Sequence, residues 1–390
     1  MLFQIKSKPE DFIVEEVLPK WVPSWRWDFL YVFFEKENLT TMDIIDYLTK
    51  NLHLQRDELG IAWLKDKAWI TKQWISISKS SLDNIWWEKF FIDMLLKKAK
   101  VLEKSYNEAW LKVASNDWNY FTICLRARQN ISDEIKAHIE NNVQKIRERW
   151  FPNCFWMQRF WKWKKNFYEA KNRLEVLAKE YREKWRLKEL DLPYHLRFLL
   201  QAYPSMYFNE YVLNRWEKWL FLLQWDILVD RFNSNWVKTA VYDSQKIYEF
   251  DYQKLKKEKT EVNYFEPDIS DKWEDFDASK WFVTWPMIWW HLLLPSEWTK
   301  ARVRDSQLLS LAEFDNWMQQ VCKIYNLWWV RRVLFVKVPD LKFEWDSDDI
   351  KLEFFLPTWS YATTLISFVL QWIDYLTLKD NSLLIPKISD

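Results

Sequence analysis

Asp66 is an acidic residue whose type and setting could support catalysis. It lies between two lysines in residues 59–76, Leu-Gly-Ile-Ala-Trp-Leu-Lys-Asp-Lys-Ala-Trp-Ile-Thr-Lys-Gln-Trp-Ile-Ser. A carboxylate held next to a substrate can act as a nucleophile or as a base without any redox cofactor. A Lys-Asp-Lys triplet by itself, however, is usually a solvated turn with a weak surface ion pair. The residues around Asp66 must therefore decide whether it does chemistry.

The chain contains 31 Trp and 1 Gly, although average glycine usage alone is about 7%. Glycine supplies left-handed backbone in turns and lets two backbones approach closely, so a chain of 390 residues should need more than one. Trp25, Trp27 and Trp359 lie in turn-like sequence next to Pro and Ser. We infer that most Trp positions stand for Gly, because UGA codons that the source reads as Gly were translated as Trp. A truly Trp-rich protein that stacks bases on its indoles is the alternative.

With Gly at Trp63 and Trp69, residues 62–73 become Ala-Gly-Leu-Lys-Asp-Lys-Ala-Gly-Ile-Thr-Lys-Gln. This segment closely resembles the catalytic motif of the TruD family of tRNA pseudouridine synthases. Asp66 occupies the position of the family's catalytic aspartate. Trp74 is our candidate for a genuine Trp, because members of this family can carry Trp at that step.

Two further motifs follow in the family's order. Residues 6–14 resemble its opening Lys-x-x-Pro-Glu-Asp-Phe motif, and Lys6 takes the place of a lysine close to the catalytic aspartate. Residues 152–163, with Gly for Trp, resemble its Pro-Asn-Tyr-Phe-Gly-x-Gln-Arg-Phe-Gly motif, except that Cys154 replaces Tyr. Asn153 and Phe155 then fall on the positions that line the family's uridine pocket.

Weaker similarities lie at residues 205–209, 281–289 and 355–363, which resemble the family's Ser-x-x-Phe-Asn, Gly-Pro-x-x-Gly and Leu-Pro-x-Gly-Ser-Tyr-Ala-Thr segments. Residues 371–390 and the acidic stretch 250–280 match nothing in the family pattern. We interpret that acidic stretch as a solvated surface loop, and its role is open.

The resemblance implies that the chain converts uridine to pseudouridine, at position 13 of tRNA. Asp66 would supply the carboxylate, Phe155 would hold the extruded base and Asn153 would read its polar edge. Lys6 would keep Asp66 ionised by proximity. No cofactor is implied, and the four scattered His residues with no acidic pair at ligand spacing indicate no metal. A catalytically inactive RNA-binding or RNA-folding protein of the same fold is the alternative.

Charge is balanced over the chain, which has 57 Lys and Arg and 56 Asp and Glu. The net charge of +1 is therefore not the strongly basic charge that is typical of a nucleic-acid-binding protein. Any RNA site must therefore be local. The expected RNA-binding residues are the basic ones around the pocket motifs, namely Arg126, Arg128, Arg159, Lys162, Lys164 and Lys165. We expect a tRNA partner, no protein partner and a monomer, while the choice of tRNA and the oligomeric state are open.

The elements that would position these residues are indicated by side-chain periodicity. Aromatic and β-branched runs predict strands at 28–34 and 118–125, and an apolar stripe predicts a helix at 41–52 that Thr40 or Thr41 caps. Further predicted helices cover 131–149, 167–190, 194–217 and 361–374. Residues 331–338 and 350–356 alternate like neighbouring antiparallel strands.

The expected fold class is α+β, in two domains. From the family resemblance, residues 1–178 and 320–390 would form a catalytic domain with a mixed, largely antiparallel sheet, and residues 179–319 an inserted α/β TRUD domain. The three Cys form no Cys-x-x-Cys pair, and no apolar run reaches the roughly 18 residues that span a bilayer. We expect a soluble protein in a reducing cytoplasm.

Overall fold

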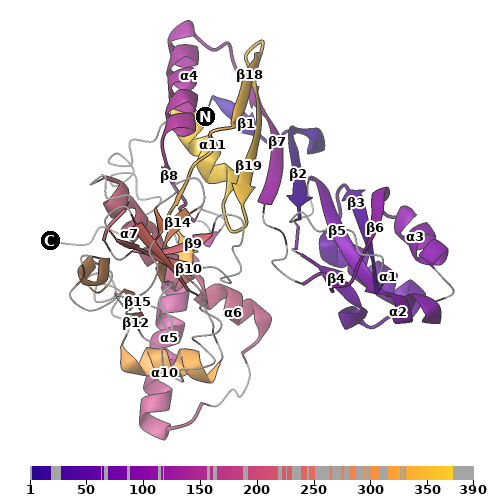
Figure 1. The fold of residues 1–390 in the computed structure, drawn as a ribbon, viewed down its shortest axis with the longest axis horizontal. Helices are drawn as coiled ribbons and strands as arrows, with labels where there is room; N and C mark the ends of the chain where they lie inside the picture. Colours follow the sequence, from indigo (N-terminus) through magenta and orange to yellow (C-terminus); the bar gives the residue numbers. More distant parts are fainter. Residues whose placement is uncertain are drawn as a thin grey trace. The chain divides into compact units, whose positions relative to one another are not determined.

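The chain forms two compact units, one of Met1–Val143 with Val338–Thr358 and the other of Gln144–Lys337 with Trp359–Asp390 (Figure 1). The domain boundaries expected at residues 178 and 320 remain a prediction. The computed structural model describes residues 2–18, 28–62, 64–65, 69–85, 88–112, 116, 118–155, 159–160, 165–187, 192–217, 222–224, 226–230, 239–243, 246–250, 264–265, 274–275, 281–286, 294–295, 299, 301–304, 306, 315–325, 327 and 331–371.

The first unit contains a sheet with nine described strands in the path β18-β19-β7-β2-β5-β3-β6, with β1 on β7 and β4 on β5. Of its described pairings, that of β2 with β5 is parallel and the others are antiparallel, so the sheet is mixed and largely antiparallel as expected. Its elements are β1 (Phe3–Ile5), η1 (Pro9–Asp11), β2 (Phe12–Val17), β3 (Phe29–Lys36), α1 (Thr41–Leu52), η2 (Arg56–Glu58), β4 (Leu59–Ile61), β5 (Ile70–Ser78), α2 (Lys79–Asn84), α3 (Glu88–Leu96), β6 (Lys100–Asn107), β7 (Trp118–Ala127), β18 (Lys342–Asp346), β19 (Asp349–Pro357) and most of α4 (Asp133–Glu148).

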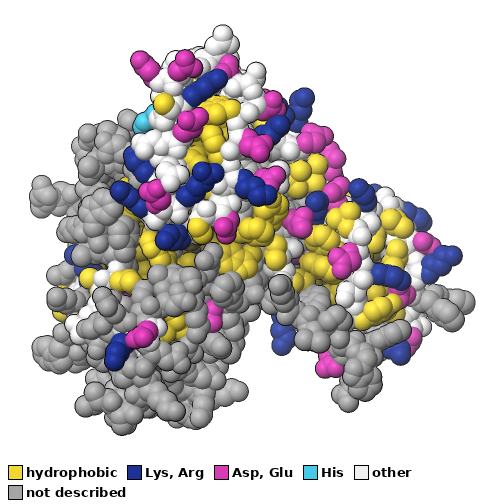
Figure 2. Space-filling view, turned by 45° about the horizontal axis from the view of Figure 1, so that its top comes forward, with side chains coloured by type: hydrophobic (Ala, Val, Ile, Leu, Met, Phe, Trp, Pro, Cys, Tyr) yellow, Lys and Arg dark blue, Asp and Glu magenta, His cyan; other side chains and the backbone are white. Residues whose placement is uncertain are grey.

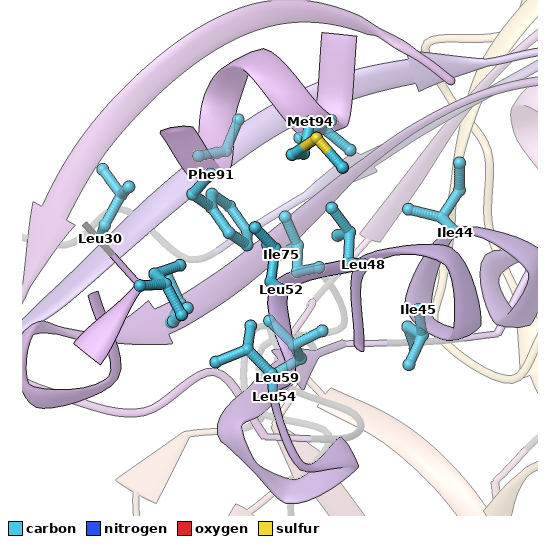
Figure 3. Packing of buried hydrophobic residues seen from close by; sticks show 14 of the residues in the cluster. Leu30, Ile44, Ile45, Leu48, Leu52, Leu54, Leu59, Ile75, Phe91 and Met94 are labelled. Carbon is cyan, nitrogen blue, oxygen red and sulfur yellow. The ribbon is translucent and has the colours of Figure 1, made fainter. Parts of the chain in front are cut away.

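Helix α1 forms where the sequence predicted it. The Thr40 hydroxyl accepts a hydrogen bond from the Asp43 N–H at 3.0 Å, and the Asp43 carboxylate accepts one from the Thr40 N–H at 2.7 Å. This capping box satisfies N–H groups that the first helical turn leaves unpaired. The apolar stripe of α1 is buried against β3, β5 and α3, where Ile44, Ile45, Leu48 and Leu52 join Leu30, Ile75 and Phe91 in one core (Figure 3).

Residues 331–338 do not neighbour residues 350–356, and that expectation was wrong. Strand β19 instead pairs with β18 and β7. A tight turn brings Asp346 opposite Asp349, and Ser347 adopts a left-handed conformation with φ of 62°. Because this hairpin places β18 beside β19, residues 331–336 pair elsewhere, with β14 and β8 of the second unit.

The second unit contains a sheet in the order β13-β11-β10-β9-β14-β16, and every described pairing in it is antiparallel. β8 pairs with β17, and β12 with β15. The elements are β8 (Phe151–Pro152), α5 (Lys165–Lys184), α6 (Tyr194–Leu200), α7 (Ala202–Glu217), β9 (Ile227–Asp230), β10 (Thr239–Asp243), β11 (Lys246–Phe250), β12 (Tyr264–Phe265), β13 (Glu274–Asp275), β14 (Trp281–Pro286), β15 (Leu294–Pro295), α10 (Asn316–Ile324), β16 (Arg331–Val333), β17 (Phe335–Val336) and α11 (Ala362–Gln371).

The helix expected over 194–217 is divided into α6 and α7 at Gln201. Pro204 explains the division, because it has no N–H to donate to the carbonyl of Leu200 and so interrupts the helical ladder there. The acidic stretch 250–280 lies mostly outside the described residues.

The backbone at two Trp residues favours the glycine hypothesis. Trp359 has φ of 73° and is 44% exposed, and Trp185 has φ of 55° and is 71% exposed. Trp185 directly follows α5, where a left-handed residue, usually Gly, commonly ends a helix. Trp281 differs, because it is the first residue of β14 and is buried. Trp25, Trp27, Trp63, Trp156 and Trp161 lie outside the described residues.

The single glycine is needed where it stands. A Cβ on Gly60 would lie 2.3 Å from the Ser76 Oγ and 2.5 Å from the carbonyl oxygen of Leu111. Such distances are far shorter than van der Waals contact, and one of the two partners is backbone that cannot swing away. β4 and the segment at Leu111 therefore approach each other at a distance that only glycine permits.

Leu48→Ala should lower the free energy of unfolding by about 2–5 kcal/mol, because it opens a cavity beneath α1 in the core of the first unit. Lys50→Ala, on the exposed face of the same helix, should change it by less than about 0.5 kcal/mol. Urea unfolding followed by circular dichroism measures both. Equal effects would mean that α1 does not bury this face.

Trp185→Gly and Trp359→Gly should leave stability unchanged or raise it, because each removes a left-handed penalty of about 1–2 kcal/mol. Trp74→Gly should instead lower it by about 3–5 kcal/mol, since Trp74 is buried and stacks on Phe33 with ring centroids 4.9 Å apart. Thermal unfolding of the three variants separates the two classes. A large loss at Trp185 and Trp359 would contradict the glycine hypothesis.

Candidate active site

Asp66 lies outside the described residues, as do Lys67 and Ala68, whereas Leu64 and Lys65 before them and Trp69 after them are described. It belongs to the connection between β4 and β5, in the first unit. On its N-terminal side the backbone of Lys65 is bound at both polar groups: its N–H donates to the Thr41 hydroxyl at 2.8 Å, and its carbonyl accepts from the Thr41 N–H at 3.3 Å. The Thr41 hydroxyl donates in turn to Gln73 of β5 at 3.0 Å. The start of α1 therefore fixes the chain one residue before Asp66.

Lys6 lies at the end of β1 in the left-handed region, with φ of 68°. Its ammonium lies 4.2 Å from the centroid of the Phe12 ring and 4.1 Å from that of Trp69. Both distances are within the range of cation–π attraction. Trp69 comes three residues after Asp66 in the same connection, so Lys6 contacts the segment that carries the candidate carboxylate. Its role beside Asp66 remains a prediction.

Asn153 belongs to the second unit and is buried. Its backbone N–H donates to the Leu334 carbonyl at 2.8 Å, and its side-chain amide donates to the Val333 carbonyl at 3.1 Å. Arg332 donates to the backbone and side-chain oxygens of Asn153, both at 3.2 Å. The Asn153 side chain is therefore bound through both its amide nitrogen and its oxygen to residues of β16.

Phe155 is 1% exposed and lies among aromatic rings of the second unit. Its ring centroid is 5.5 Å from that of Phe208 and 5.7 Å from that of Tyr361. Asn209 holds the backbone of Phe155 from both sides, accepting from its N–H at 2.7 Å and donating to its carbonyl at 2.8 Å. The Ser-x-x-Phe-Asn segment of α7 thus supports the pocket motif directly.

Arg332 was not singled out in the sequence, and the structure places it beside both pocket residues. Its guanidinium lies 4.0 Å from the centroid of Phe155, and no carboxylate contacts it within the part of the chain that the structure describes. Burial, with repulsion from Arg159, lowers the pKa of Arg332 to about 10. Arg332 therefore remains charged near pH 7 and is stabilised by rings and carbonyl oxygens instead of an acid. The Arg331-Arg332 doublet is a signal that could have directed attention here.

The expected RNA-binding residues have different surroundings. Arg126 is held by two carboxylates, at 2.7 Å from Asp11 and 2.8 Å from Asp349, and these hydrogen bonds raise its pKa. Arg159 is 8% exposed and donates to Gln201 at 2.9 Å. The exposed ones in the described part are Arg128 and Lys165, whereas Lys162 and Lys164 lie outside it.

Figure 2 shows Lys and Arg side chains interspersed with Asp and Glu over the face in view. The described residues include no helix that is long and apolar enough to cross a membrane. Within the same residues, no group of three or more His, Cys, Asp or Glu is arranged to hold a metal ion.

A family model described as tRNA pseudouridine synthase D (TruD) matches residues 2–184, which include Lys6, Asp66, Asn153 and Phe155. The tRNA pseudouridine synthase D of Sulfurimonas denitrificans is 29% identical over 215 residues, which cover 55% of each chain. The match to its counterpart in Thermus thermophilus covers 54% of each. The chain thus spans about half the length of these relatives, whereas the match to the counterpart of Campylobacter jejuni serotype O:6, at 25% identity, covers 95% of both.

A crystal structure of a TruD protein from Methanosarcina mazei has a TM-score of 0.60 to this chain at 19% identity, and the match covers 95% of this chain and 93% of that one. This likeness confirms the expected α+β fold. The range matched by the family model contains the segments around residues 6–14, 62–73 and 152–163. The chain is therefore similar to the TruD family over residues 2–184, and its similarity to the Campylobacter jejuni relative extends along most of its length.

Proposed function

We propose that this chain isomerises uridine to pseudouridine in tRNA, at position 13, with Asp66 as the catalytic carboxylate. In this reaction the bond from C1′ of the ribose to N1 of uracil breaks, and a bond from C1′ to C5 forms. The proton on C5 leaves to solvent and N1 gains one, so substrate and product are isomers and no oxidant or reductant is needed. One carboxylate, acting as nucleophile or base, suffices.

The observation that carries this proposal is the family match over residues 2–184, because that range contains all four of the candidate residues. The bound backbone of Lys65 adds physical support. A catalytic carboxylate must be held within a fraction of an ångström of its productive position, and the chain next to Asp66 is tied to α1 by two hydrogen bonds.

Asn153 and Phe155 would serve as a rigid wall for the extruded uracil. Rigidity matters because ordering mobile side chains costs entropy, and this cost would reduce the binding free energy of a base that has left its stack. The hydrogen bonds of Asn209 and Arg332 remove that freedom before substrate arrives. Because Phe155 is buried, its replacement by Ala would also disturb the fold, so it is a poor choice for a catalytic test.

The remaining assignments belong to the same proposal. The catalytic domain would comprise residues 1–178 and 320–390 with residues 179–319 inserted, and the enzyme would act as a cytoplasmic monomer on tRNA without a cofactor.

Asp66→Asn should abolish turnover while leaving folding and tRNA binding intact, because it keeps the size of the side chain but removes its charge and nucleophilic oxygen. The measurement is tritium release from C5 of [5-³H]uridine in unmodified tRNA transcripts that carry uridine at position 13. Binding is followed in parallel by filter retention of the same transcripts.

The assay is run on the printed chain and on a form with Gly at positions 63 and 69, because Trp63 and Trp69 flank Asp66. Turnover by the Asn variant near the parental rate would remove Asp66 from the mechanism. Parental proteins that bind tRNA but release no tritium would instead favour the inactive RNA-binding alternative.

Arg128→Ala should weaken tRNA binding and reduce the slope of log affinity against log salt concentration by about 1. The reason is that binding without this phosphate contact releases fewer counterions from the RNA. Lys100→Ala removes the same charge from an exposed site on β6, outside the expected RNA path, and should leave the slope unchanged. Titrations between low and moderate salt compare the two variants. Equal slopes would exclude Arg128 from the RNA interface.

A further inference from the structure

Strands β2 and β5 separate next to the connection that carries Asp66. Their parallel pairing runs from Ile13 opposite Ile70 to Glu15 opposite Lys72 and extends no further. β2 continues along β7, where Glu16 lies opposite Asn119. The N–H of Trp74, on β5 beyond the separation, donates to the Glu16 carboxylate at 3.2 Å. A side chain thus takes the place of the missing ladder.

Glu16 and Lys65 form a buried ion pair at this point. The Lys65 ammonium lies 3.4 Å from the Glu16 carboxylate, and the two side chains are 9% and 0% exposed. The ammonium also donates to the side-chain oxygen of Asn119 at 2.6 Å. Burial raises the pKa of the Glu16 carboxyl, and the charge of Lys65 opposes that rise. Lys65 is therefore held by side-chain contacts on both β2 and β7.

The same network reaches the closing family motif. Asn116 donates to the oxygen of Asn119 that accepts from Lys65, at 3.3 Å. The carbonyl of Asn116 accepts from the buried hydroxyl of Thr358 at 2.6 Å. The contact gives the Leu-Pro-Thr segment at the end of β19 a physical connection to the residue that precedes Asp66.

We propose that Lys65 and Glu16 are positioning residues for the catalytic step, and that their buried ion pair fixes the peptide leading into Asp66. The proposal rests on the assignment of Asp66 as the catalytic carboxylate. Lys65 is bound at its N–H, at its carbonyl and at its ammonium, by α1, β2 and β7. Every contact restrains the bond that joins it to Asp66.

Stability alone does not account for this pair. Removing two charges from water offsets most of their attraction, so a buried ion pair is often no more stable than a neutral pair of the same volume. An apolar side chain in place of Lys65, however, could not donate hydrogen bonds to Glu16 on β2 and Asn119 on β7. Stability and positioning can therefore be separated by experiment.

The first test uses Glu16→Gln, with kcat and KM measured by tritium release from [5-³H]uridine tRNA transcripts. A displacement of the carboxylate by about 1 Å should lower kcat by about 100-fold, while KM for tRNA stays within about twofold because no RNA contact is removed. Hydrogen–deuterium exchange in the peptide that spans residues 62–70 should become faster. Unchanged kcat and unchanged exchange would overturn the proposal.

Glu15→Gln is the matched control. Glu15 is the adjacent residue on β2 and pairs with Lys72 of β5 at 3.1 Å, but its side chain is 34% exposed and lies on the other face of the strand. Its loss should leave kcat within about twofold. An equal loss of kcat in both variants would show a general effect of the strand and would overturn the proposal.

The double variant Glu16→Gln with Lys65→Met separates stability from position. It removes both buried charges, so urea unfolding should return toward the parental midpoint, while kcat should stay low because the contacts to β2 and β7 are lost. Recovery of kcat together with stability would overturn the proposal.

Thr41→Val provides a variant that changes no charge and almost no volume. It removes the hydroxyl that holds the Lys65 N–H and should also lower kcat at constant KM. Normal kcat in Thr41→Val would overturn the proposal even if the charge variants fail to fold. Failure of the proposed function is distinguishable, because then the parent would be inactive or Asp66→Asn would be active.

Discussion

The buried charge of Glu16 constrains the arrangement of the first unit. A carboxylate with no exposed surface requires opposite charge and hydrogen-bond donors around it. The structure supplies them from three directions, with Lys65 before Asp66, the Trp74 N–H on β5 and the charge of buried Lys36 on β3. Because Lys65 and Trp74 belong to different segments, their contacts with one carboxylate fix those segments relative to β2.

The second unit meets the same requirement with the opposite sign. Arg332 is buried beside Asn153 and Phe155, and rings and backbone carbonyls surround its guanidinium. An arginine stacked on aromatic faces loses less hydration than an ammonium group would, which makes it the suitable cation for such a place. Its hydrogen bonds join β16 to the pocket motif, two segments about 180 residues apart in the sequence.

Local patterns in the sequence predicted what depends on local interactions. The apolar spacing and capping residues of α1 determine that helix without help from distant residues, and β3 and β7 carry side chains suited to a pleated sheet. Pairing between distant segments was harder, because alternation in 331–338 says that a strand exists but not which strand it joins. For the same reason the sequence did not indicate that Arg126 meets Asp11 and Asp349, which are distant in sequence.

The identity of residue 69 bears on the chemistry as well as on the fold. In the printed sequence the Lys6 ammonium lies over two rings, and Trp69 is the nearer of them. With glycine at this position the contact with this ring is absent, and cation–π contact and ion pairing compete for the same charge. A carboxylate near a freer cation ionises more readily. The ring of Trp69 therefore competes with any carboxylate for the charge of Lys6, and glycine at this position would remove that competitor.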